Sequence, residues 1–263
     1  MIRLYNQNIW GNMPAEARIS NRNDLIRDMI FELEPDFCSF QECNPTTSRA
    51  VKNAIQDIIS DRYAECAAEH AYENFTPVFY KKERFSELDS GFVPFSGLND
   101  KRSKSLTWGL FEDKTDGKRV VVVSTHFWWK STGEVDELQR ADNAKALLEV
   151  CDAVQKKYGE LPVVISGDFN STVNGLGYKT VTEGGFTDAR LVAKSSDTTH
   201  TLHEYPTLTS EGVYVPHSAA PVKTIDFVFT YGKKPAVKAF RVLADDRAKT
   251  SSDHCPLVAE FEI

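Results

Sequence analysis

The sequence predicts an α/β fold, and three observations support this prediction. Strand-like and helix-like segments alternate along the chain, and two of these alternations have the form of a β-α-β unit. Hydrophobic residues make up 41% of the chain and charged residues 26%, so apolar material for a core is ample. No linker rich in proline, serine or glycine divides the 263 residues, and we expect a single domain over residues 1–263.

The first β-α-β unit covers residues 2–41. Residues 2–9 are typical of a strand, and the short apolar run 36–41 is typical of a buried strand. Between them, residues 20–33 carry apolar side chains at helical spacing, and Pro35 follows as a stop. A second helix is expected over 46–59.

The second unit begins with residues 119–125, which include four consecutive valines. A helix is expected over 134–158, and a buried strand over 161–166. Segment 168–178 is polar and rich in glycine, and the weakly patterned segment 195–218 is expected to run over the surface. Further strands are expected over 75–80, 88–95, 106–111, 224–230 and 256–261.

Charge and cysteine content exclude several classes of protein. Lys and Arg total 31 and Asp and Glu total 38, so the net charge of −7 provides no global positive field for coating nucleic acid. The five cysteines are an odd number without zinc spacing, which indicates free thiols in a reducing compartment. The N-terminal residues lack the pattern of a signal peptide, and no run approaches the roughly 20 apolar residues of a membrane span. We expect a cytoplasmic protein, or a secreted one if a leader has been removed.

Polar residues recur near the ends of the predicted strands or just beyond them. In α/β folds ligands bind at strand ends and in the loops that follow, so residues far apart in sequence can meet there. Any one of these residues alone is more often a turn former, a helix cap or a core histidine. The candidates are Asn8, Glu42, His126, Asp168, Asn170, Asp226, Asp253 and His254.

The chemistry of this set is that of metal-assisted phosphoester hydrolysis. Carboxylate and amide oxygens are hard ligands suited to Mg²⁺, Mn²⁺ or Ca²⁺. Histidines nearby exchange protons near neutral pH or stabilise anionic oxygen. A carboxylate behind a histidine orients it. The pair His200 and His203 has the spacing of a zinc fragment but lacks further ligands, so we interpret both as ordinary loop residues.

Six sequence blocks, taken together, are far more specific than any single residue. In these blocks the chain resembles the endonuclease/exonuclease/phosphatase (DNase I-like) superfamily. The resemblance extends over nearly the whole chain and is strongest to the compact bacterial members. The resemblance implies a four-layer α/β sandwich, in which two packed mixed β-sheets are flanked by helices. The blocks are Tyr5-Asn6-Gln7-Asn8-Ile9, Phe40-Gln41-Glu42, Ser124-Thr125-His126, Ser166-Gly167-Asp168-Phe169-Asn170-Ser171, Thr224-Ile225-Asp226-Phe227-Val228-Phe229 and Ser251-Ser252-Asp253-His254-Cys255-Pro256-Leu257.

The resemblance also implies a metal site. Glu42 matches the main metal-binding glutamate of the family, and Asn8 beside it would touch metal-bound water or phosphate. Asp253 matches a second acidic contact to metal or water. The expected cofactor is Mg²⁺, with Mn²⁺ as an alternative.

Five further residues match catalytic positions of the family. Asp168 would align or activate the attacking water, and Asn170 would hold water or a phosphate oxygen. His254 matches the catalytic histidine and Asp226 the acid that hydrogen-bonds it. Whether His254 acts as a base or as a phosphate-stabilising cation stays open at this point. His126 matches a second histidine, which donates to the phosphate or protonates the leaving group.

Two departures and one match qualify the resemblance. Thr224 stands where many relatives carry an arginine, and Phe227 replaces a tyrosine, which puts a phosphate or scaffold contact in doubt. The Thr125-His126 block favours the DNase I, deadenylase and phosphatase side of the superfamily over its apurinic-site endonucleases.

Substrate contacts are expected in loops around this site. We expect Trp128 or Trp129 to form a substrate wall, because aromatic faces stack on bases and sugars. The alternative is that at least two of the three residues Trp10, Trp128 and Trp129 pack in the core or under a loop. Asn74 and Tyr80 are further candidates.

A short basic run, Lys101-Arg102-Ser103-Lys104, is either a phosphate clamp or a solvated turn.

The most specific hypothesis is a Mg²⁺-dependent hydrolase that cleaves a phosphodiester or phosphomonoester by attack of an activated water. A nuclease acting on single-stranded or short nucleic acid is one alternative, and a catalytically silent phosphate-binding protein is another. The expected substrate is a phosphorylated small molecule or a short single strand. Extensive contact with duplex DNA is not expected, and we expect a monomer.

Overall fold

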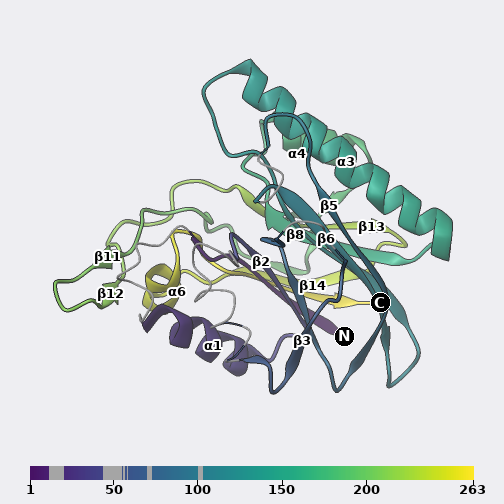
Figure 1. Cartoon of the computed structure of the whole chain (residues 1–263), viewed down its shortest axis with the longest axis horizontal. Helices are drawn as coiled ribbons and strands as arrows, with labels where there is room; N and C mark the ends of the chain where they lie inside the picture. Colours follow the sequence, from purple (N-terminus) through teal and green to yellow (C-terminus); the bar gives the residue numbers. More distant parts are fainter. Residues whose placement is uncertain (12–20, 44–54, 56, 58, 70–72, 100–102) are drawn as a thin grey trace.

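Two β-sheets packed face to face form the centre of the molecule, and helices cover their outer faces (Figure 1). The computed structural model describes residues 1–11, 21–43, 55, 57, 59–69, 73–99 and 103–263. Both sheets are mixed, since each contains parallel and antiparallel neighbours. The α/β fold class and the four-layer sandwich expected from the sequence are confirmed.

Both predicted β-α-β units form parallel strand pairs. In the first sheet β1 (Ile2–Asn8) lies parallel to β2 (Phe37–Gln41) and antiparallel to β15 (Leu257–Glu262). In the second sheet β7 (Arg119–His126) lies parallel to β8 (Pro162–Asp168). Each parallel pair is flanked by antiparallel neighbours, so the two sheets have the same central arrangement.

The other strands extend these sheets outward. The order is β10-β14-β15-β1-β2-β4-β3 in the first sheet and β5-β6-β7-β8-β13-β9 in the second. A separate hairpin of β11 (Thr207–Leu208) and β12 (Tyr214–Val215) projects from the body (Figure 1). The remaining strands are β3 (Tyr63–Glu65), β4 (Val78–Lys81), β5 (Phe85–Pro94), β6 (Ser105–Asp113), β9 (Thr187–Asp188), β10 (Ser195–Ser196), β13 (Asp226–Gly232) and β14 (Ala236–Val242).

Helices cover the two sheets on opposite sides. The helices α1 (Asn21–Leu33) and α6 (Asp246–Ser251) share a hydrophobic cluster with the first sheet. The helix α3 (Glu134–Tyr158) has the bounds expected from the sequence, and it packs with α4 (Leu176–Glu183) on the second sheet. A single short turn, α5 (Ala189–Val192), follows β9.

The valine run of β7 shows why this sheet is buried on both faces. Val120 and Val122 belong to the core between the sheets, whereas Val121 and Val123 pack under α3. Successive side chains of a strand point to opposite faces, and a sheet covered on both sides therefore needs apolar residues at every position.

Toward the carboxyl ends of the parallel strands, the layer between the sheets becomes polar. The Gln41 side-chain amide donates to Asn6 Oδ1 at 2.9 Å and to Ser124 Oγ at 3.0 Å, which joins the two sheets. All three side chains of this bridge are buried. The polar layer lies between the hydrophobic core and the candidate site described below.

One helix in the connecting segments was not predicted, and one prediction for them needs correction. The polar stretch after β8 leads into α4, which a glycine-rich sequence did not indicate. The segment 195–218 is only partly a surface excursion, because Thr201, His203 and Tyr214 are buried. Leu202 bridges to Lys223 and His254, so the part of the segment around residues 201–203 runs inside the molecule, alongside the connection that leads to the last strand.

The helix expected over 46–59 lies largely outside the described residues; Ile55, Asp57 and Ile59 are helical. All five cysteines are buried and free, as expected. Within the described chain, no helix has the length and apolar character needed to cross a membrane.

Candidate active site

The eight polar residues singled out from the sequence lie within one set of contacts at the carboxyl ends of β1, β2, β7 and β8. Register explains why: His126 is paired with Asp168 across β7 and β8, and Asp168 with Asp226 across β8 and β13. In the first sheet Asn8 is the partner of Gln41, the residue before Glu42.

Asn8 joins the two sheets. Its side-chain nitrogen donates to Asp168 Oδ2 at 2.9 Å and to Glu42 Oε1 at 3.3 Å. The Asn8 oxygen accepts the backbone N–H of Trp10, which fixes the orientation of the amide. One side chain therefore contacts both carboxylates and holds them in position.

Glu42 sits on a strained turn directly after β2. Its φ is 54°, in the left-handed region that non-glycine residues rarely adopt. The backbone N–H of Gly11 donates to Glu42 Oε2 at 3.1 Å. A Cβ on Gly11 would lie 1.8 Å from the Glu42 carbonyl oxygen, so this close approach requires glycine.

Asp168 is fixed from several sides. The backbone N–H of Asn170 donates to its Oδ1 at 2.8 Å, and His126 Nε2 lies 3.3 Å from its Oδ2. Asn170 also has a left-handed φ of 48°, and its side-chain amide donates to the Phe127 carbonyl. The carboxylate thus has a defined direction, with little freedom to rotate.

His254 is paired with a buried carboxylate. Its Nδ1 lies 2.9 Å from Asp226 Oδ2, and the Thr201 hydroxyl donates to the same oxygen at 2.6 Å. His254 Nε2 faces the other acids, at 3.9 Å from Asp168 Oδ2 and 4.0 Å from Asp253 Oδ2. Thr201 was not among the predicted site residues, because nothing in the pattern of segment 195–218 marks it.

Lys104 is a further cation at the site. Its Nζ lies 2.7 Å from His126 Nε2, and the side chain is buried. The sequence places Lys104 in a basic run of which Lys101 and Arg102 lie outside the described residues. The available signal was its position just before the strand that pairs with the His126 strand.

Nearby cations shift the pKa values of two of the carboxylates downward. Burial raises the pKa of Glu42, but the positive charges of His126, Lys104 and His254 outweigh burial and lower it. Burial also raises the pKa of Asp168, and its hydrogen bond to His126 together with the same cations brings it well below the ordinary value. Both groups are therefore ionised at neutral pH.

The pKa values of Asp253 and His254 move upward. Burial raises the pKa of Asp253 to about 6, and the charge of Glu42 adds to this effect. Burial lowers the pKa of His254, but the carboxylates of Asp226, Asp253 and Asp168 outweigh burial and raise it well above the ordinary value. Acidic groups are crowded enough here to favour protonation of their neighbours.

The donor set fits a divalent cation. Asp168, Asp226 and His254 each offer a ligand atom within 4.8 Å of the others. His254 and Asp226 already satisfy each other, so the oxygens of Glu42 and Asp253, with the Asn8 amide, are the better ligands for a hard cation. A bound cation would offset the burial and the nearby Glu42 charge that raise the pKa of Asp253.

A cavity of about 580 Å³ opens over these residues. Trp129, with 59% of its surface exposed, lines it. Trp128 is 8% exposed and its indole N–H donates to Asp136 at 2.6 Å, away from this cavity. The lining residues are Trp10, Gly11, Glu42, Phe75, Ser103, Lys104, Trp129, Asp168, Asn170, Leu202, Tyr205, Lys223, Ile225, Asp253 and His254.

Two other predicted substrate residues lie elsewhere. Asn74 is buried and donates to Thr107 at 2.9 Å, while Tyr80 packs against Phe111 with ring centroids 4.9 Å apart. Neither is among the described residues that line the cavity.

Trp10, which the sequence placed among the aromatic candidates, lines the cavity together with Tyr205, which the sequence did not single out. Trp10 and Tyr205 are stacked, with ring centroids 4.9 Å apart. Arg22, which is fully buried, donates to the Ile9 carbonyl at 2.8 Å and lies over the rings of Trp10 and Tyr214 at 5.4 and 5.8 Å. Arg22 thus connects the loop after β1 to the β11–β12 hairpin.

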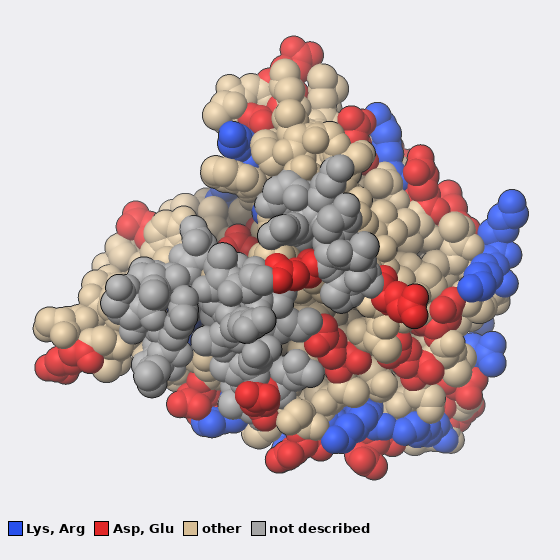
Figure 2. All heavy atoms as spheres, in the orientation of Figure 1, with Lys and Arg blue, Asp and Glu red and all other residues tan. Residues whose placement is uncertain are grey.

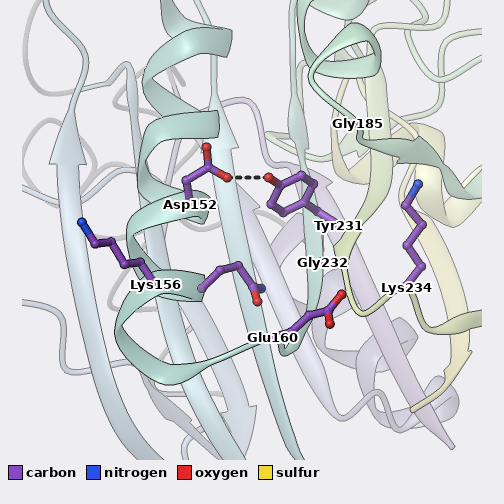
Figure 3. Close-up of a pocket in the computed structure, with 8 residues that line it drawn as sticks. Asp152, Lys156, Glu160, Gly185, Tyr231, Gly232 and Lys234 are labelled. Atoms are coloured by element: carbon purple, nitrogen blue, oxygen red, sulfur yellow. Dashed lines mark hydrogen bonds between the residues drawn. The ribbon is translucent and has the colours of Figure 1, made fainter.

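A second cavity of about 460 Å³ lies at the other end of β13, where Gly232 is paired with Pro162. Figure 3 shows the Tyr231 hydroxyl directed at Asp152, with Lys156 and Lys234 on either side. Because Asp226 and Gly232 are opposite ends of one strand, this cavity is separate from the candidate active site.

Comparison with known proteins places this geometry in context. The model of the endonuclease/exonuclease/phosphatase family matches residues 6–254. Carbon catabolite repressor protein 4 homolog 3 of Arabidopsis thaliana is 22% identical over 179 residues, which cover 64% of this chain and 37% of that protein. The match therefore spans well under half the length of this curated relative.

Solved structures share the fold along the whole chain. An endonuclease/exonuclease/phosphatase from Bacteroides vulgatus superposes with a TM-score of 0.76 at 23% identity, covering 100% of this chain and 98% of that one. A mannosyl-6-phosphatase from Bacteroides thetaiotaomicron superposes with a TM-score of 0.78 at 17% identity, covering 100% of both chains.

Proposed function

Because the chain belongs to the endonuclease/exonuclease/phosphatase family, whose members hydrolyse phosphoester bonds, we propose that it is a divalent-metal-dependent phosphoesterase. The observation that carries this proposal is the bridge formed by Asn8. It holds Asp168 and Glu42 together across the two sheets, opposite a histidine that Asp226 keeps charged.

Mg²⁺, or Mn²⁺ in its place, would be held by Glu42 and Asp253 with the Asn8 amide. When bound it would supply a Lewis acid that polarises the phosphate and compensates its charge. The remaining contributions come from side chains whose positions are described above.

Asp168 is suited to align the attacking water and to accept its proton at Oδ2. Its Oδ1 is held by the Asn170 backbone, so Oδ2 points in a fixed direction. The Asn8 donor on Oδ2 helps to keep the carboxylate ionised before the reaction begins.

His254 is suited to act as a cation. Its Nδ1 is engaged by Asp226, and its raised pKa keeps the ring protonated at neutral pH. The free edge, Nε2, then presents a proton toward the site, where it would stabilise an anionic phosphate oxygen. This supports the phosphate-stabilising role over the base role left open by the sequence. His126 lies on the neighbouring strand β7, on the other side of Asp168 from Asp226. We assign to it the protonation of the leaving-group oxygen.

We assign the substrate to phosphorylated small molecules with a ring in the alcohol part. Trp129 and the Trp10–Tyr205 pair offer aromatic faces in one cavity of about 580 Å³ with the catalytic residues. On the face shown in Figure 2, described Lys and Arg side chains are interspersed with Asp and Glu and form no continuous basic band. The fold shared with a mannosyl-6-phosphatase is consistent with a sugar phosphate.

A nuclease acting on short single strands is the second candidate. The same aromatic faces that would pack on a sugar would stack on a base. Sequence-tolerant stacking needs no basic band, so the surface charge disfavours only long duplex substrates.

A panel of phosphoesters tests the proposal. The substrates are sugar phosphates, nucleotides and short oligonucleotides. Each is incubated with the wild-type protein in the presence of Mg²⁺, Mn²⁺, Ca²⁺ or EDTA. The same substrates are incubated with the variants Asp168→Ala and His254→Ala. We expect metal-dependent hydrolysis that EDTA and either substitution abolish. Hydrolysis that survives EDTA, or either substitution, would contradict the assignment.

A further inference from the structure

Lys223 is a cation of the candidate active-site cavity to which the proposed function gives no role. It lies just before β13, the strand that begins with Asp226. The residue is half-buried, and it lines the same cavity of about 580 Å³ as Asp168 and His254. Within the described part of the chain, the Lys223 ammonium forms no hydrogen bond and no ion pair. The cavity therefore contains a positive charge that no side chain neutralises by direct contact.

The carboxylate on which the Lys223 charge acts, Glu137, has partners of its own. It accepts the Leu176 backbone N–H at 2.8 Å and forms an ion pair with Arg140. Burial raises the pKa of Glu137, the contacts with Leu176 and Arg140 bring it below the ordinary value, and the charge of Lys223 adds a smaller decrease. Glu137 does not depend on Lys223, so the ammonium is available to a ligand in the cavity.

Backbone pairing directs Lys223 and His254 to the same face. Leu202 is paired antiparallel with Lys223 on one side and with His254 on the other. Residues directly opposite each other in neighbouring strands point their side chains to the same face, and all three of these residues line the cavity. Two antiparallel steps of about 4.5–5.5 Å place the Lys223 and His254 backbones about 10 Å apart.

Hydrogen bonds on both sides of Leu202 hold this row together. The Lys223 carbonyl accepts the N–H groups of Thr201 at 3.0 Å and of Leu202 at 2.8 Å. On the other side, the His203 N–H donates to the Asp253 carbonyl at 2.9 Å. The backbone positions of the cation and of the candidate catalytic histidine are thus fixed relative to each other.

The row offers three chemically different groups to a ligand. His254 presents Nε2 to the scissile phosphate in the proposed function, Leu202 offers an apolar side chain, and Lys223 ends the row with a positive charge. A substrate that lies along the row places its scissile phosphate at His254, its carbon skeleton over Leu202 and a further anionic group at Lys223. A lysine ammonium binds phosphate as a point charge with several N–H donors.

We propose that Lys223 binds a second phosphate of the substrate, one that is not cleaved, so that the enzyme prefers molecules with two phosphates. This inference rests on the phosphoesterase function proposed above and narrows its substrate class. The second phosphate belongs either to a sugar bisphosphate or to a nucleoside bisphosphate, and the contact with Lys223 is the same in both. Lys223 transfers no proton, and no bond to it forms or breaks.

Kinetics on matched substrates test the proposal. Wild type, Lys223→Met, Lys223→Arg and Lys223→Glu are assayed in Mg²⁺ on a hexose monophosphate and on a bisphosphate of the same hexose. A nucleoside monophosphate and the bisphosphate of the same nucleoside form the second pair. We expect the wild-type kcat/KM to be about tenfold higher for a bisphosphate than for its monophosphate in at least one pair. The pair that shows this preference identifies the source of the second phosphate.

The variants should change the preference and leave the monophosphate reaction nearly unchanged. Lys223→Met keeps the apolar stem and should remove the preference through a higher KM for the bisphosphate. Lys223→Arg should keep most of it, and Lys223→Glu should reverse it by repelling the second phosphate. A loss of equal size on the monophosphate and the bisphosphate would overturn the inference, because Lys223 would then act on the scissile phosphate or on the site as a whole.

Lys234→Met is the matched control. Lys234 follows the other end of β13 and lines the second cavity, as Figure 3 shows. Its substitution changes the net charge by the same amount as Lys223→Met, and it should alter the kinetics on neither substrate of a pair. A loss of the bisphosphate preference in Lys234→Met as large as in Lys223→Met would reduce the effect to net charge and contradict a contact at Lys223.

A titration separates this inference from the proposed function. Each monophosphate and bisphosphate is titrated calorimetrically in Mg²⁺ into Asp168→Asn, which lacks the carboxylate assigned to the attacking water, and into the double variant with Lys223→Met. We expect a bisphosphate to bind Asp168→Asn about tenfold more tightly than its monophosphate, and the double variant to bind both alike.

The outcomes distinguish the two proposals. If the wild type cleaves monophosphates and bisphosphates with equal kcat/KM and Lys223→Met changes neither, the inference fails and the proposed function stands. If the wild type cleaves no phosphoester, the proposed function fails, and the titration still decides whether Lys223 binds a second phosphate. Equal binding of monophosphate and bisphosphate to Asp168→Asn would overturn the inference.

Discussion

The Nδ1 atom of His254 lies 2.9 Å from Oδ2 of Asp226, and both groups are buried. The Thr201 hydroxyl donates a second hydrogen bond to that oxygen. His254 therefore has one nitrogen committed to a carboxylate and the other directed at the site.

Asp226→Asn tests this pair, because it keeps the shape of the side chain and removes its charge. We expect kcat to fall by roughly 10²–10⁴, as losses from a charge behind a catalytic histidine do. Without the carboxylate the pKa of His254 falls, so the protonated form is lost at lower pH. The high-pH limb of the pH–rate profile should therefore move to lower pH. Asp152→Asn, in the second cavity, is the matched control and should change neither kcat nor the profile.

Asp253→Asn should stabilise the metal-free protein. The pKa of Asp253 is about 6 in the folded protein and about 3.9 when unfolded, so folding favours its protonated form. This contribution to stability is present below pH 4 and is lost as the pH rises through 6. The asparagine variant should thus exceed wild type by up to about 3 kcal/mol at pH 8 and match it at pH 4, measured by urea unfolding in EDTA. Added Mg²⁺ should stabilise wild type more than the variant, and an equal gain would contradict Asp253 as a metal ligand.

Trp128 and Trp129 should respond to alanine substitution in opposite ways. Trp129→Ala should raise KM on the true substrate several-fold and leave the melting temperature nearly unchanged, because the side chain is 59% exposed at the cavity. Trp128→Ala should cost about 3–5 kcal/mol of unfolding free energy, since it removes a buried indole that donates to Asp136. An unchanged KM for Trp129→Ala would remove this residue from the substrate wall.

Arg22→Met should loosen the aromatic lining. The guanidinium donates to the Ile9 carbonyl and lies over Trp10 and Tyr214, so its loss leaves a buried acceptor unpaired. We expect a loss of about 1–3 kcal/mol, a changed near-ultraviolet circular dichroism signal from Trp10, and a higher KM. Arg27→Met, on the same helix but in surface ion pairs with Asp24 and Asp28, should change stability by less than about 1 kcal/mol. Equal effects of the two substitutions would contradict the role given to Arg22.

The fold could be predicted from the chain because its signals are local and periodic. Four consecutive valines at 120–123 indicate a strand covered on both faces, and apolar side chains at helical spacing indicate the helices that cover the sheets. The strand-end positions of Asn8, Glu42, His126 and Asp168 followed from the same reading, since the ends of parallel strands meet at one edge.

Tertiary packing decided the rest of the site. Trp128 and Trp129 are neighbours in sequence, yet Trp128 is buried and donates to Asp136 of α3, whereas Trp129 is exposed and lines the cavity. Thr201 comes from a segment without a motif and reaches the site beside Leu202, which bridges to His254. Lys104 belongs to a basic run that the sequence could interpret in two ways, and the pairing of β6 with β7 places it at the site. The left-handed backbone at Trp10, Glu42 and Asn170 is likewise held by contacts with residues distant in sequence, and no local pattern encodes it. Side chains could be assigned to an edge of a sheet from periodicity alone, but which of them touch depends on how the two sheets pack against each other.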